Sequence, residues 1–168
     1  MEILNTNRLI LRTMCEEDFK ILHEKIFSNK KVVENTFGSS GFSKEDTKEF
    51  LKAKGNFDKK IGLSVLEEKS SKNIIGLAGI LPCKYLGEED YEIGFILEEN
   101  SWGKGYAKEI GIEQIQQIKT LGKSRAIAAA AKENISSHKA LTNLGFKFVK
   151  DSYDEIRGKR VIYSLEFE

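Results

Sequence analysis

The chain has 168 residues, of which 40% are hydrophobic and 32% are charged. This length and composition predict a globular protein with a single domain over residues 1–168, and they exclude a disordered or fibrous chain. Lys and Arg number 27 and Asp and Glu number 26, so the formal net charge is only +1. Without a basic excess the chain cannot neutralise many backbone phosphates, which argues against nucleic acid as a partner.

Cysteine usage and the apolar runs predict the cellular compartment. Cys15 and Cys83 lie far apart and form no C-x-x-C pair, which is typical of reduced thiols in a cytosolic protein. Residues 1–12 lack the basic-then-apolar order of a signal peptide. No apolar run approaches the roughly 20 residues needed to cross a bilayer. We therefore expect a cytoplasmic protein without a membrane partner.

The first half of the chain predicts two helices among three strands. Alternating residues over 8–13 predict a strand, and apolar residues at helical spacing over 16–28 predict a helix. Ser43 followed by Asp46 resembles a capping box that starts a second helix over 43–54. Two further strands are expected at 61–66 and 73–81.

Strands and helices alternate in the second half. A strand over 91–98 leads into a loop with two glycines and then a long helix. Residues 125–131 could be helical by composition, but Gly122 ends the preceding helix and Asn134 can cap the next one, so a buried strand is expected. The remaining elements are a helix over 135–144 and strands over 147–153 and 161–167. This order predicts a mixed sheet flanked by helices.

The loop between the strand and the long helix is the most informative stretch. Gly103 and Gly105 carry no Cβ atoms, so the backbone can approach a ligand closely. The first N–H groups of the following helix lack internal partners and lie at the positive end of its dipole. A phosphate or pyrophosphate site with Lys104 beside it is one interpretation, and an ordinary turn is the other. A dinucleotide-binding fingerprint is absent because its third glycine is replaced by Lys108.

Three motifs, in this order, resemble the GCN5-related N-acetyltransferase (GNAT) superfamily and, within it, the ribosomal-protein N-terminal acetyltransferase-like branch. Residues 7–12 (NRLILR) resemble the first strand of that branch. Residues 102–107 (WGKGYA) resemble its coenzyme A pyrophosphate loop. Residues 134–137 (NISS), followed by 143–146 (NLGF), resemble its N-x-x-S…GF helix.

The resemblance implies an α/β (α+β) fold in one acetyltransferase domain. The central sheet would be mixed and mostly antiparallel, with about seven strands flanked by about four helices. Its fourth and fifth strands, here near 91–98 and 125–131, would splay apart to form a cofactor cleft. The implied activity is transfer of an acetyl group from the co-substrate acetyl-coenzyme A (acetyl-CoA) to an amine, without a metal ion.

The resemblance also assigns cofactor-binding residues. The pantetheine arm would bond to the backbone of Phe95, Ile96 and Leu97, as an added strand would. The backbone N–H groups that would hold the pyrophosphate follow Trp102 and belong to Gly103, Lys104, Gly105, Tyr106 and Ala107. Asn134 would meet the pantetheine or the thioester, and Lys139 could reach the phosphate of the adenosine end.

Two positions depart from the family pattern. The loop usually begins with Gln or Arg three residues before its first glycine, where this chain has Asn100. Many relatives carry a tyrosine four residues before the glycine of the GF pair, as the proton donor to the leaving thiolate, where this chain has Leu141. Ser137 is the nearest candidate for that proton transfer, and solvent is the alternative.

Acetyl transfer requires a neutral amine, so a base or a water chain must take the proton. Glu92 is the candidate base, because the related branch often assigns an acidic residue at this place as a base that acts through water. The alternative interpretation is a solvated or ion-paired strand residue. Neither cysteine belongs to a site motif, so direct attack is expected, with a backbone N–H near Ile96 as the oxyanion donor.

The acceptor amine is not specified by the sequence, and a protein N-terminus and a small molecule both fit. The two helices of the first half and the loop after Pro82 are expected to bind it. Aromatic residues there, with Glu88, Glu89 and Asp90, would suit a cationic amine, and ordinary core and surface positions are the alternative interpretation of the same residues. Two other functions stay open: a CoA-binding regulatory module without turnover, and a structural domain. A monomer and a homodimer are both compatible with the sequence.

Overall fold

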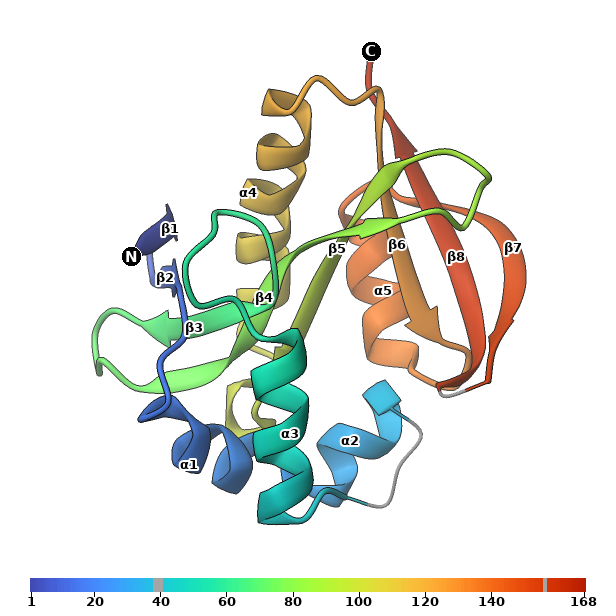
Figure 1. Ribbon diagram of the computed structural model, residues 1–168. Coiled ribbons are helices and arrows are strands. Elements are labelled where there is room, and N and C mark those ends of the chain that lie inside the picture. Colours follow the sequence, from blue (N-terminus) through green and yellow to red (C-terminus); the bar gives the residue numbers. More distant parts are fainter. Residues whose placement is uncertain (38–40, 156) are drawn as a thin grey trace.

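The computed structural model describes residues 1–37, 41–155 and 157–168. Over these ranges eight strands form one sheet in the order β1-β2-β3-β4-β5-β6-β8-β7, with β1 and β7 at opposite edges (Figure 1). The strands are β1 (Glu2–Asn5), β2 (Leu9–Arg12), β3 (Ser64–Glu68), β4 (Ile74–Cys83), β5 (Asp90–Leu97), β6 (Arg125–Ala131), β7 (Lys147–Asp154) and β8 (Gly158–Glu166). The helices are α1 (Asp18–Leu22), the π-helix η1 (His23–Phe27), α2 (Lys30–Phe37), α3 (Lys44–Lys54), the 3-10 helix η2 (Glu99–Ser101), α4 (Tyr106–Thr120) and α5 (Ile135–Asn143).

The sheet is antiparallel except where β5 meets β6. These two strands run parallel and are in register only at Glu92 and Ile127. By contrast, β6 pairs with β8 along its whole length, from Arg125 to Ala131. Beyond Glu92, therefore, β5 and β6 diverge. The expected mixed sheet with a splayed gap is confirmed.

Helices cover both faces of the sheet, because successive residues of a strand point to opposite faces. On β4, Leu77 belongs to the same buried cluster as Leu51 of α3. The next residue, Ala78, belongs to a second cluster with Ile110 of α4. Leu141 of α5 joins α4 residues in a third cluster. The helices α1–α3 thus cover one face and α4 and α5 cover the other, and Figure 1 shows α3 and α4 on opposite sides of the sheet.

Two elements were not expected from the sequence. The strand β1 pairs with β2 at the edge of the sheet. The helix α2 buries only Val32 and Val33, so its apolar pattern is too short to be distinguished from a loop. Among the described residues the sheet has eight strands where about seven were expected, and there are five α-helices where about four were expected.

The expected helix over 16–28 is two elements. It begins as α1 and continues as the π-helix η1, which Ser28 closes by donating to the carbonyl of His23 at 2.8 Å. The expected capping box of α3 is confirmed: the Asp46 N–H donates to Ser43 Oγ at 3.0 Å, and the Ser43 N–H donates to Asp46 Oδ2 at 3.1 Å. The expected strand over 125–131 is also confirmed, as β6. In the described ranges no helix is both long and apolar enough to cross a membrane.

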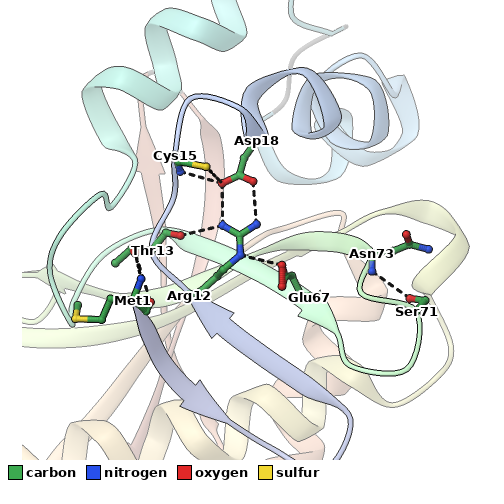
Figure 2. Close-up of polar contacts among 8 residues, drawn as sticks. All are labelled: Met1, Arg12, Thr13, Cys15, Asp18, Glu67, Ser71 and Asn73. Atoms are coloured by element: carbon green, nitrogen blue, oxygen red, sulfur yellow. Dashed lines mark hydrogen bonds and ion pairs between the residues drawn. The ribbon is translucent and has the colours of Figure 1, made fainter.

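Arg12 fastens α1 to the sheet. Its guanidinium donates to both carboxylate oxygens of Asp18, at 2.9 and 2.8 Å, and to Glu67 on β3 at 2.8 Å (Figure 2). Asp18 also accepts from the Cys15 N–H at 2.9 Å. Burial raises the pKa of Asp18, but the hydrogen bonds from Arg12 and the Cys15 amide outweigh it, and the pKa is lowered overall.

We expect Asp18→Asn to lower the free energy of unfolding by about 2 kcal/mol at pH 7, because Arg12 loses one of its two carboxylate partners and keeps only Glu67. Since the folded pKa of Asp18 is depressed, this stabilisation is complete above the ordinary Asp pKa of about 4 and is lost as the pH falls through the folded pKa. Urea unfolding of both proteins from pH 7 downward measures the difference. The exposed Asp58→Asn is the control. A constant difference at all pH values would contradict the ion-pair account.

Candidate active site

A cleft of about 390 Å³ opens where β5 and β6 diverge. Its walls are the end of β5, the loop that follows Trp102, the first turn of α4, the helix α5 and the inner side of α2. All residues that the sequence predicts for cofactor binding line it except Lys104: Phe95, Ile96, Leu97, Trp102, Gly103, Gly105, Tyr106, Ala107, Asn134 and Lys139. Segments that are far apart in the sequence therefore meet at this gap.

The loop at the mouth of the cleft has the geometry of an anion site. Gly103 and Gly105 have φ values of +75° and +81°, a left-handed conformation that favours glycine. Gly105 is the N-cap of α4, and the first helical hydrogen bond is donated by Glu109 to the Gly105 carbonyl at 3.1 Å. The backbone N–H groups between Gly105 and Glu109 have no acceptor within the helix, and they lie at the positive end of the helix dipole. A diphosphate fits this arrangement.

Arg8 holds this loop in place, which the sequence did not indicate. Its Nη1 donates to the Lys104 carbonyl at 2.9 Å, and its Nε donates to Glu109 Oε2 at 2.7 Å. The guanidinium also lies 4.3 Å from the ring centre of Tyr106. Burial raises the pKa of Glu109, but hydrogen bonds from Thr6 and from the Arg8 amide and side chain lower it overall, so Glu109 stays charged. The motif that contains Arg8 pointed to a strand and not to this contact.

Trp102 ties the loop to the strand before it. Its indole Nε1 donates to the Leu97 carbonyl at 3.0 Å, while much of its ring stays exposed. The end of β5 and the loop over residues 103–107, which we call the anion loop, are therefore linked. The predicted contact of Trp102 with a cofactor is compatible with this position, because the residue lines the cleft.

Lys104 is placed differently from the other predicted residues. Its carbonyl is held by Arg8, and the residue does not line the cleft, whereas Lys108 does. The sequence alone does not distinguish Lys108 as a cleft residue, because its place there depends on where the first turn of α4 lies. Asn35 and Thr36 also line the cleft, and they were missed because α2 was missed.

Asn134 joins α5 to α2 at the far wall. Its Oδ1 caps α5 by accepting from the Ser137 N–H at 3.2 Å, and its Nδ2 lies 3.4 Å from the Asn35 carbonyl. Ser137 follows on the first turn of α5 and lines the cleft. Lys139 lines the same wall and is exposed to solvent.

A second cavity, of about 480 Å³, adjoins the first. Thr36, Phe95, Ile96 and Ser137 line both cavities, so the two spaces meet at the splayed part of β5. Glu92 lines the second cavity and not the first. The leucine at the usual tyrosine position, Leu141, also lines the second cavity.

Glu92 is a buried carboxyl group whose side chain faces other polar groups of the second cavity. Only 9% of the residue is exposed. Burial raises the pKa of Glu92, and the Tyr85 hydroxyl together with Arg157 and Arg160 offsets part of the rise. Burial and the nearby Glu92 raise the pKa of Tyr85 to about 12, so its hydroxyl stays protonated at neutral pH. A buried carboxyl group with a raised pKa beside a cavity is suited to proton transfer.

The acidic residues of the loop after Pro82 do not form the cation site that was expected. Glu88 and Asp90 pair with Arg125, at 3.2 and 3.0 Å, and Glu89 lies 3.7 Å from Lys84. None of the three lines the second cavity. Over residues 1–37, 41–155 and 157–168, no group of three or more His, Cys, Asp or Glu side chains could hold a metal ion.

Comparisons with known proteins agree with this geometry. An uncharacterized N-acetyltransferase of Bacillus subtilis (strain 168), YnaD, is 30% identical over 146 residues, which span 86% of this chain and 82% of the relative. The structure of a GNAT-family acetyltransferase from Bacillus anthracis has a TM-score of 0.77 at 22% identity, with 99% and 98% of the two chains covered. A spermidine N-acetyltransferase from Vibrio cholerae, solved with CoA and spermine, has a TM-score of 0.73 at 19% identity, with 95% of each chain covered.

The family model described as Acetyltransferase (GNAT) domain matches residues 8–147, which include β2, the anion loop and α5. This chain belongs to the GNAT family of acetyltransferases.

Proposed function

We propose that this N-acetyltransferase passes the acetyl group directly from acetyl-CoA in the first cavity to a primary amine in the second, with Glu92 as the base. The observation that carries the proposal is the meeting of the two cavities at Ile96 and Ser137, with the buried Glu92 on the acceptor side. Within the family, the motifs over 7–12 and 134–146 support the ribosomal-protein N-terminal acetyltransferase-like branch. We also infer a cytoplasmic location, because Cys15 and Cys83 are both free.

The first cavity supplies groups for each part of the co-substrate. The turn of backbone N–H groups from Gly103 to Ala107 suits the diphosphate, and Lys108 or Lys139 suits a further phosphate at the rim. Beyond Glu92, the edge of β5 that faces β6 pairs with no strand among the described residues, so Phe95 to Leu97 can pair there with an extended amide-bearing arm. The B. subtilis relative is named as an N-acetyltransferase, and the V. cholerae structure contains CoA, which supports the same co-substrate here.

Glu92 is suited to take the proton of the acceptor amine. An alkyl amine is mostly protonated at neutral pH, and only its neutral form attacks a carbonyl carbon. As the new N–C bond forms and the C–S bond breaks, one proton leaves the nitrogen and the sulfur gains one. Glu92 receives the first, through a water molecule in the second cavity. The backbone N–H near Ile96 is the oxyanion donor.

Ser137 is the proposed proton donor to the leaving thiolate. It is half-buried and lines both cavities, and its backbone is fixed by the Asn134 cap at 3.2 Å. Leu141, one turn further along α5, has no exchangeable proton. Solvent that enters through the cleft is the alternative donor.

The direct test of the function is thiol release from acetyl-CoA by the purified protein with a panel of primary amines. The proposal predicts acetyl transfer to at least one amine. CoA binding without any transfer would instead identify a regulatory module, and the absence of CoA binding would exclude both.

We expect Gly105→Ala to weaken CoA binding about tenfold, because a Cβ atom strains a left-handed residue by about 1–2 kcal/mol and shifts the anion loop. Gly122→Ala is the matched control: its φ of +80° is almost the same as that of Gly105, at the other end of α4. Both variants should lose similar stability in urea unfolding. Calorimetric titration with CoA checks the difference, and equal affinity in both variants would show that the loop does not hold the cofactor.

We expect Glu92→Gln to reduce kcat at least about a hundredfold, with CoA affinity changed less than about twofold. Because the base must be ionised, the activity of the natural protein should fall as the pH drops through the raised pKa of Glu92. That acidic limb of the pH–rate profile should be absent in the variant. The exposed Glu88→Gln is the control. An unchanged profile for Glu92→Gln would mean that another group, or solvent alone, is the base.

A further inference from the structure

The charged side chains of the second cavity are not all paired. Arg157 is satisfied: its Nε donates to Asp154 Oδ2 at 3.0 Å, and its Nη2 donates to the Tyr85 hydroxyl at 3.0 Å. Arg160, three residues later on β8, lines the same cavity. The polar contacts of Arg160 differ from those of Arg157.

Arg160 is a buried cation without a carboxylate partner. Only 5% of the residue is exposed, and no Asp or Glu oxygen lies within 4.0 Å of its guanidinium among the residues that the structure describes. Its Nη2 donates to the Thr36 carbonyl at 2.9 Å, whereas its Nε is buried and has no hydrogen-bond partner. Arginine is almost never buried unless it is paired, because removing its charge from water is costly.

Glu92 does not fill this role. It lies near enough for Arg160 to influence its pKa, but the two do not form an ion pair. Lys54 adds another cation to the lining of the cavity, and Asp154 is already bound to Arg157. The lining of the cavity therefore has an excess of positive charge: Lys54, Arg157 and Arg160 against Glu92 and Asp154.

The cavity also has apolar lining residues. Phe37 and Phe50, together with Leu81 and Leu141, line it. The two phenyl rings belong to a cluster in which their centroids lie 5.5 Å apart. A ligand that fills the cavity would thus meet apolar side chains as well as the polar groups of Glu92 and Arg160.

We propose that the acceptor is a small primary amine that also carries a carboxylate and an apolar side group, with the carboxylate bound by Arg160. This inference rests on the proposed acetyl transfer and names its substrate class. The bound carboxylate gives Arg160 the charged partner that no described residue supplies, and it accepts from the Nε. It also orients the amine toward Glu92. A polyamine would place further cations beside Arg160 and Lys54 and is disfavoured.

The test compares acceptors that differ only in the acidic group, with the full chain and saturating acetyl-CoA. Leucine and phenylalanine are each measured against the corresponding amide, and spermidine is added as a polyamine. We expect kcat/KM for an amino acid to exceed that for its amide by about 10- to 100-fold, the range for a charged hydrogen bond. This comparison uses the natural protein and depends on no variant.

Arg160→Gln should remove the preference. We expect kcat/KM for the amino acid to fall about 10- to 100-fold through KM, while kcat/KM for the amide changes less than about threefold. Arg160→Lys keeps the charge and should retain part of the preference. Lys159→Gln, the exposed neighbour on β8, is the control for loss of a positive charge. A purely structural role for Arg160 would lower the rates for acid and amide alike.

The outcomes separate this inference from the function on which it rests. Faster transfer to an amide than to its amino acid would overturn the carboxylate site and favour a peptide N-terminus, while acetyl transfer itself stands. Faster transfer to spermidine would overturn it in favour of a polyamine. Absence of transfer to every amine, with CoA bound, would refute both the function and the inference.

Discussion

The short hydrogen-bonded contact between β5 and β6 is the constraint on which the site depends. Because the two strands are in register only at Glu92 and Ile127, the sheet is continuous at that point and open beyond it. The opening leaves unpaired the edge of β5 that faces β6. Residues of α5 and α2 form the remaining walls of the cleft. The same contact places Glu92 at the apex of the gap. One break in a ladder thus creates both the cleft and the position of the candidate base.

The arginine side chains lie in two kinds of polar environment, one with carboxylate partners and one without. Around Arg8 and Arg12 each guanidinium meets carboxylates at 2.7 to 2.9 Å, and these clusters fix the anion loop and α1 to the sheet. Around Arg160 the guanidinium is buried, and none of the carboxylates in the described part of the chain pairs with it. Paired clusters stabilise the fold, whereas an unpaired buried charge is destabilising until a ligand compensates it. Glu92 and Arg160 both belong to the second cavity, where the chemistry is expected.

Local patterns predicted most of the fold. The capping box of α3 and the strand over 125–131 were recognisable, because residues close in the sequence determine them. Elements with few buried side chains, such as β1 and α2, left no pattern to read. The position of the loop beside the cleft was predictable for the same reason, since its glycines mark it in the sequence, and its binding of CoA stays a prediction. The contacts of Arg8 and Arg160 were not predictable, because each joins residues about 100 or more positions apart in the sequence. Lys108 lines the cleft whereas Lys104 does not, a difference that depends on how the turn is folded, and the predicted contact of the Lys104 N–H with the diphosphate stays a prediction.

The crystal structure of the protein with CoA tests the central claim most directly. The account predicts that the diphosphate oxygens lie within about 3 Å of the backbone nitrogens between Gly103 and Ala107. It also predicts that the pantetheine arm lies beside Phe95 to Leu97 in the gap, with the sulfur near Ser137. A nucleotide bound elsewhere on the protein, or a gap closed by pairing of β5 with β6, would contradict it.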